Sequence, residues 1–128
     1  MDKLAKRTQI CMISFATEIC LCGLSWAMQG CFGFAERGYT KSHLFVVLLG
    51  VLHITIIVPT LIGLKLQKDS CLFIADFAAL GLAVLNFILC LNNLFDTTIA
   101  LITGIFALVF DFALFFTTTY YIQRSEEN

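Results

Sequence analysis

The sequence predicts an all-α integral membrane protein, an antiparallel bundle of four transmembrane helices joined by short loops. Of its 128 residues, 59% are hydrophobic and 13% are charged, against about 45–50% and about 25% in soluble proteins. A soluble chain this short leaves much of its surface in water, and here that surface would be apolar. Lipid is therefore the expected solvent for most of the chain.

Four apolar stretches provide the predicted spans, at residues 10–34, 44–64, 71–91 and 98–122. Each has about 20–25 residues, enough for a helix rising about 1.5 Å per residue to cross a hydrocarbon core of about 30 Å. The stretches lack the alternation of polar and apolar residues that is typical of β-barrel strands. Short connections make consecutive helices antiparallel neighbours, so we expect one transmembrane domain over residues 1–128.

The basic residues predict the orientation of this tetraspan bundle. Six of them are expected at the end that holds both termini: Lys3, Lys6, Arg7, Lys65, Lys68 and Arg124. Only Arg37 and Lys41 are expected at the opposite end. The positive-inside rule then places both termini in the cytosol, or in the matrix for a mitochondrial protein. Trp26 and Tyr39 are expected near the outer interface, where aromatic side chains gather.

Each predicted span holds one ionisable residue near its middle or in its inner half. These residues are Glu18, His53, Asp76 and Asp111. A charged side chain at the bilayer centre costs about 2.5–3.5 kcal/mol on insertion scales, so such groups should face protein and not lipid. We therefore expect the four to meet as one intramembrane polar cluster.

Small and polar residues share a helix face with each of these four groups, at steps of three and four residues. The residues of these stripes are Ser14, Cys22, Ser25, Gly50, Ala79, Ala83, Asn86, Gly104 and Ala107. Small side chains let helix backbones approach closely in lipid, so the stripes are the predicted packing faces. In the second span, Pro59 lacks an amide hydrogen and should kink the helix by freeing the carbonyl of Thr55.

Three interpretations of the polar cluster are open. The acids form structural hydrogen bonds between helices, at about 0.6 kcal/mol for an average bond. Alternatively, they pair with basic or polar residues on the helices of a partner protein. In the third interpretation, they form a proton or cation path, for which intramembrane carboxylates with a histidine are the usual groups.

The sequence carries no sign of an enzyme or of a cofactor, metal or nucleic-acid site. A net charge of −1 gives no basic footprint for nucleic acid, and no hydrolytic, phosphate-binding or cofactor motif occurs. His53 and the carboxylates lack the short fixed spacing of a metal site. We therefore expect no catalytic residues, no cofactor and no metal.

Six cysteines lie within or at the ends of the spans, and most are expected to be small apolar packing residues. Cys31 and Cys90 both fall near the outer ends of spans, where an oxidising compartment would allow a disulfide. Cys11 and Cys71 fall near the inner ends, where palmitoylation occurs.

The loops are too short to hold a folded soluble module, so function is expected within the plane of the membrane. The leading hypothesis is an accessory or structural subunit that packs laterally in a larger membrane assembly. Its expected partners are other transmembrane proteins and membrane lipids, and a homo-oligomer is possible. The alternative is a protein that conducts or transports protons or cations through the carboxylate and histidine cluster. Whether the outward faces of the helices are uniformly lipid-like or include a polar residue that points away from the bundle would discriminate the two hypotheses.

Overall fold

The computed structural model describes residues 3–37, 41–92 and 98–127, and these form five α-helices. They are α1 (Lys3–Arg37), α2 (Lys41–Thr55), α3 (Ile57–Leu66), α4 (Asp69–Leu91) and α5 (Thr98–Glu127). Within the described ranges, four helical segments are long and apolar enough to cross a membrane: Lys6–Gly33, Leu44–Leu66, Asp69–Leu91 and Thr98–Arg124. The predicted fold class is confirmed. Tyr39 and residues 93–97, which precede the fourth span, lie outside the described residues.

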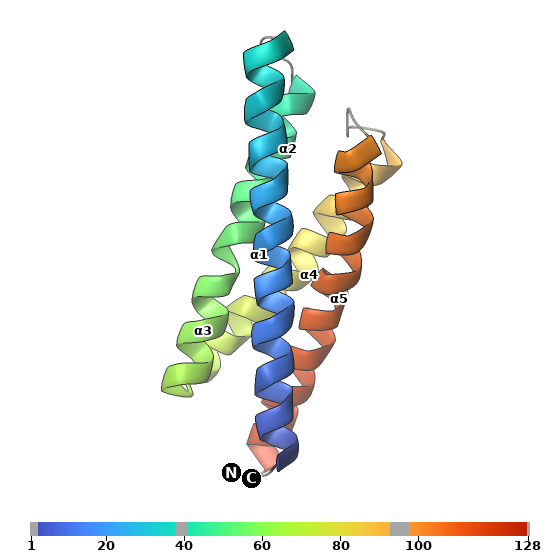
Figure 1. Cartoon of the computed structure of the whole chain (residues 1–128). Helices are drawn as coiled ribbons and strands as arrows, with labels where there is room; N and C mark the ends of the chain where they lie inside the picture. Colours follow the sequence, from blue (N-terminus) through green and yellow to red (C-terminus); the bar gives the residue numbers. More distant parts are fainter. Residues whose placement is uncertain (1–2, 38–40, 93–97, 128) are drawn as a thin grey trace.

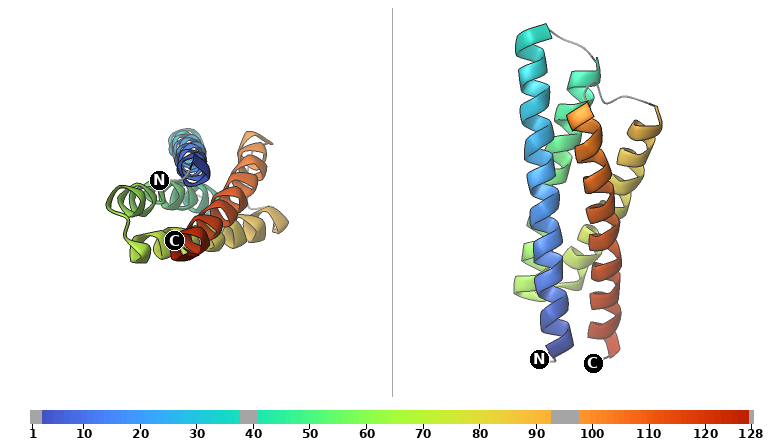
Figure 2. Two further views of the ribbon diagram at one scale, coloured as in Figure 1. Left: turned by 90° about the horizontal axis from the view of Figure 1, so that it is seen from below. Right: turned by 45° about the vertical axis from the view of Figure 1, so that its right-hand side comes forward.

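The helices pack antiparallel around a common core (Figure 1). Helix α1 packs against α2 and α5, and α4 packs against α5 and α3, so that each span has its most extensive packing with two others. The beginning of α1 and the end of α5 lie at the same end of the bundle (Figure 2). The second span consists of α2 and α3 together.

The interruption between α2 and α3 lies where Pro59 predicts it. Ile56 separates the two helices, and Pro59 is the third residue of α3. Because proline has no amide hydrogen, the carbonyl of Thr55 lacks the bond that a continuous helix would give it. The chain changes direction at this point (Figure 1).

A two-residue turn joins α3 to α4 and is held by side-chain hydrogen bonds. Gln67 has a left-handed backbone conformation (φ 53°) and donates from its side-chain amide to the carbonyl of Leu64 at 2.8 Å. The Tyr121 hydroxyl donates to Gln67 Oε1 at 2.8 Å and accepts from Gln9 Nε2 at 2.8 Å. These bonds tie α1 and α5 to the turn at the end of the bundle that holds the termini.

Helix α1 buries a regular face whose residues are separated by steps of four and three. The residues of this face are Met12, Ala16, Ile19, Gly23, Trp26 and Gly30. At its centre, α1 and α2 touch through glycine. A Cβ atom added at Gly23 would lie 2.5 Å from the carbonyl oxygen of Gly50, and one added at Gly50 would lie 2.5 Å from that of Gly23.

This buried face differs from the stripe predicted for the first span. Ser14 and Glu18 are exposed, and Cys22 and Ser25 are only half-buried. Most of the predicted stripe lies one residue before the buried face, which on a helix is a rotation of about 100°. The close contact at Gly23 and the volume of the Trp26 side chain determine which face turns inward.

The other predicted packing stripes lie on buried faces. Ala79, Ala83 and Asn86 in α4 are fully buried. Gly50 in α2 is buried, as are Gly104 and Ala107 in α5. All six cysteines are free thiols, either exposed or half-buried.

Two hydrophobic clusters fill the core. One lies toward the ends that hold the termini and includes Ile56 of α2–α3 and Leu114 of α5. The other lies toward the opposite end and includes Leu49 of α2 and Ala107 of α5. His53 stands between Leu49 and Ile56 along its span, and Asp111 stands between Ala107 and Leu114. The two clusters therefore meet at the level of His53 and Asp111.

Candidate functional site

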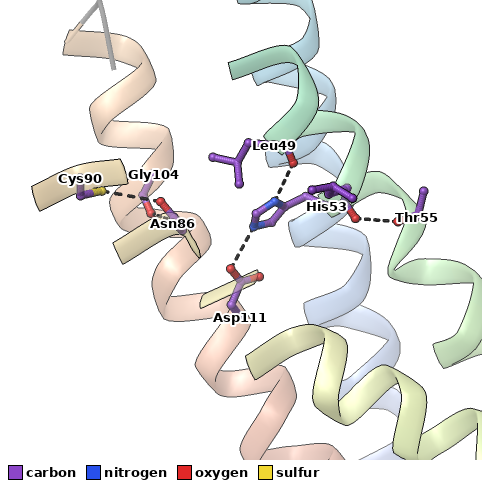
Figure 3. A network of polar contacts seen from close by, with 8 residues as sticks. Leu49, His53, Thr55, Asn86, Cys90, Gly104 and Asp111 are labelled. Atoms are coloured by element: carbon purple, nitrogen blue, oxygen red, sulfur yellow. Dashed lines mark hydrogen bonds and ion pairs between the residues drawn. The ribbon is translucent and has the colours of Figure 1, made fainter. Parts of the chain in front are cut away.

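The centre of the bundle holds a hydrogen-bonded pair formed by His53 of α2 and Asp111 of α5 (Figure 3). The distance from His53 Nε2 to Asp111 Oδ2 is 2.9 Å, and both side chains are 0% exposed. His53 Nδ1 lies 2.8 Å from the carbonyl oxygen of Leu49. Each nitrogen of the imidazole thus has one partner, and the ring is fixed between two spans.

These partners determine how many protons the pair holds. A carbonyl oxygen only accepts hydrogen bonds, so His53 Nδ1 carries a hydrogen and donates it to Leu49. The contact between Nε2 and Oδ2 then requires one more proton, which either the imidazole or the carboxyl group carries. In both forms the pair has no net charge. Asp111 Oδ1 is buried without a hydrogen-bond partner, which favours the form with a neutral carboxyl group, because an unpartnered charged oxygen is the more costly to bury.

Trp26 of α1 covers the imidazole. The rings of Trp26 and His53 meet edge to face, with centroids 4.9 Å apart and planes at 73°. The indole Nε1 donates to the carbonyl oxygen of Ala100 in α5 at 3.1 Å. Trp26 is therefore a core residue that joins α1 to α5. Its partner Ala100 is the third residue of α5, at the end of the bundle opposite the termini, and a position near the outer interface stays a prediction.

Asn86 makes a second polar contact between helices, between α4 and α5 (Figure 3). Its side-chain amide donates to the carbonyl oxygen of Gly104 at 2.9 Å, and its Oδ1 accepts from the Cys90 thiol at 3.6 Å. Gly104 has no side chain to cover its carbonyl, so the asparagine reaches the backbone directly.

Asp76 has a partner of its own and does not join the central pair. The hydroxyl of Thr119 in α5 is shared between its two carboxyl oxygens, at 2.9 Å and 3.0 Å. Thr119 lies eight residues beyond Asp111, which is about 12 Å along a helix. Asp76 and Thr119 thus form a separate contact between α4 and α5.

Glu18 is the one predicted cluster residue that lies on the outside of the bundle. It lines a groove between α1 and α5, together with Leu21, Cys22, Ser25, Thr103, Phe106 and Phe110. Cys22 follows Glu18 by four residues, so the two side chains lie on the same face of α1. The prediction that all four ionisable groups meet in one cluster is therefore corrected: two of them meet, Asp76 binds Thr119, and Glu18 faces outward.

Sequence reasoning missed Gly23, Trp26 and Thr119. The small residues Ala16, Gly23 and Gly30 recur every seven positions in α1, and this repeat was the available sign of the buried face. Thr119 has no comparable sign, because many threonines in membrane helices bind only their own backbone. Thr103, for example, donates to the carbonyl oxygen of Ile99 at 2.8 Å.

Among the described residues, no group of three His, Cys, Asp or Glu side chains is arranged to hold a metal ion. Comparison with known proteins found no match to a family model, to a curated protein or to a solved structure. The polar contacts and the groove are therefore the observations on which a functional proposal rests.

Proposed function

We propose that this protein is an accessory or structural subunit that packs laterally against other transmembrane proteins in a larger membrane assembly. The observation that supports this proposal is the exposed Glu18. It lies 12 residues from the Lys6 end of its candidate span and 15 residues from the Gly33 end. These separations correspond to about 18 Å and about 22 Å, so the carboxyl group lies in the middle part of its candidate span.

Among the described residues, the two buried acids have partners within the chain. Asp111 binds His53, and Asp76 binds Thr119. Glu18 instead lines the same groove as the polar side chains of Ser25 and Thr103. Because intramembrane ionisable groups face protein or a water-filled cavity and not lipid, a protein surface outside this chain is the natural partner for Glu18.

Conduction of protons or cations is the second candidate function, favoured by the single proton that His53 and Asp111 share. A conducting protein needs groups that exchange ions with both sides of the membrane. His53 and Asp111 have no exposed surface, and Trp26 packs against the imidazole. This enclosure supports a structural role for the pair, in which it connects the two hydrophobic clusters.

We also propose that both termini face the cytosol, or the matrix in a mitochondrion. The basis is the division of the basic residues, with six on one side against two on the other, and the positive-inside rule.

The exposed faces of the spans carry large apolar side chains, among them Phe77, Leu91 and Ile99, which suits contact with lipid tails.

Site-specific photo-crosslinking in native membranes tests the proposed function. A photoreactive amino acid replaces Leu21, which lines the groove, or Phe77, which is exposed on α4 and does not line it. We expect one discrete protein adduct from the Leu21 position and none of that size from Phe77. The adduct should be lost when Glu18→Leu is added. Adducts with lipid alone from both positions would contradict the proposal.

A further inference from the structure

We infer that the groove between α1 and α5 binds a transmembrane helix of another membrane protein that carries a lysine or arginine near the middle of the bilayer. This inference rests on the proposed function and specifies the chemistry of the partner. Its basis is the set of hydrogen-bonding atoms that the groove presents and the absence of a matching group within this chain.

The polar atoms of the groove are rich in hydrogen-bond acceptors. Glu18 contributes a carboxyl group at mid-depth. Thr103 already uses its hydroxyl hydrogen on the carbonyl of Ile99, so its oxygen can only accept a further bond. The Ser25 hydroxyl accepts from Gln29 at 2.8 Å, so it keeps its own hydrogen and the acceptors of the groove are Glu18 and Thr103. Lys and Arg side chains are pure donors with three and five hydrogens, and they match such a set better than an amide or a hydroxyl does.

The apolar part of the groove also suits a basic side chain. Phe106 and Phe110 lie on its α5 side, and Leu21 on its α1 side. The methylene chain of Lys or Arg packs on apolar surface while its charged end reaches a polar group, and aromatic faces attract cations. Cys22 is a small side chain within the groove, which leaves room for a neighbouring helix.

A second copy of this chain lacks the matching cation. Within residues 1–128, Lys and Arg are absent from residues 8–36, 42–64, 69–91 and 98–123. His53, the only imidazole within the central part of a span, is buried and bonded on both nitrogens. A carboxylate in lipid is best balanced by an opposite charge at the same depth, so charge complementarity favours a different protein as the partner.

A binding experiment with a synthetic helix tests this partner chemistry. The probe is a single-span poly-leucine helix without tryptophan, labelled with dansyl and carrying one lysine at its midpoint. Matched probes carry leucine or glutamate there. Trp26, the only tryptophan of the chain, is the fluorescence donor in phosphatidylcholine vesicles that contain the full protein and one probe.

We expect the lysine probe to bind about tenfold more tightly than the leucine probe, as one good polar contact between helices provides. Glu18→Leu should lower the energy transfer of the lysine probe to the level of the leucine probe. Glu36→Gln, which changes an exposed acid farther along the same helix, should leave the energy transfer unchanged. The emission spectrum of the buried Trp26 verifies that each variant is folded.

Equal binding of the lysine and leucine probes to the wild-type protein would overturn the inference. So would self-association that depends on Glu18 and excludes the lysine probe, because a second copy would then occupy the groove. If the lysine probe fails while the native crosslink from Leu21 still requires Glu18, the proposed function stands and the partner chemistry is wrong. If both fail, both proposals are wrong.

Discussion

Replacing Asp111 by asparagine or by leucine distinguishes the two proton arrangements of the central pair. His53 Nδ1 donates to Leu49, so a neutral imidazole accepts at Nε2. The side-chain amide introduced by Asp111→Asn would donate to that nitrogen as a neutral carboxyl group does, and we expect this substitution to cost less than about 1 kcal/mol. Asp111→Leu leaves Nε2 buried without a partner, which costs about 1–3 kcal/mol.

The opposite arrangement gives a different order of stabilities. If the pair were an imidazolium and a carboxylate, Asp111→Asn would leave a buried charge without its counter-ion, a loss of about 3–5 kcal/mol. The free energy of unfolding, measured by SDS titration in mild detergent micelles at constant pH, separates the two cases. An asparagine variant that is as unstable as the leucine variant, or less stable, would refute the neutral pair.

Three further predictions concern packing, conduction and topology. Gly50→Ala places a Cβ against the backbone of α1, and this variant should lose about 2 kcal/mol of stability through overpacking. In the control variant Gly81→Ala, the added Cβ meets nothing within 4 Å, so the thermal unfolding temperature should stay the same or rise. Reconstituted wild-type protein should show no proton flux in liposomes under a pH gradient or a membrane potential, and a reproducible current abolished by Asp111→Asn would favour conduction over a structural pair. Cysteine reporters added before Asp2 and after Asn128, in a variant without the native cysteines, should both react only from the cytosolic side, and labelling from opposite sides would exclude the antiparallel four-span arrangement.

The sequence was informative about the spans because length and hydropathy suffice to identify a helix that crosses a bilayer. It was also informative about the inward faces of α4 and α5. In those helices the face that carries the ionisable residue and the small residues is also the buried face. Asp111 and Ala107, for example, are both buried in α5. The break in the second span follows from the covalent chemistry of Pro59, which does not depend on the neighbouring helices.

The inward face of α1 could not be identified in the same way. Two stripes with the same alternation of three and four residues run along this helix, one through Glu18 and one through Gly23. In a soluble protein, the more hydrophobic stripe would be the buried one. Lipid is as apolar as a protein core, so there is no hydrophobic driving force that turns either stripe of α1 inward. Packing decides, and packing depends on which residues of α2 and α5 stand opposite.

The contacts of α1 also explain why Glu18 remains outside. Turning α1 by about 100° to bring Glu18 inward would break the close contact of Gly23 with Gly50 and the bond from Trp26 to Ala100. It would also bring a second carboxyl group toward Asp111 in the core.

Among the described residues, the core contains one imidazole, that of His53, and its two nitrogens already have partners. A second acid at this level would be buried without a hydrogen-bond donor. The free energy cost of burying it is larger than the stabilisation from an average hydrogen bond between membrane helices. The bundle therefore accommodates Asp111 and excludes Glu18. Since a carboxyl group at mid-depth still requires a polar neighbour, the packing that completes the core of this chain also produces the surface on which a partner helix is expected to bind.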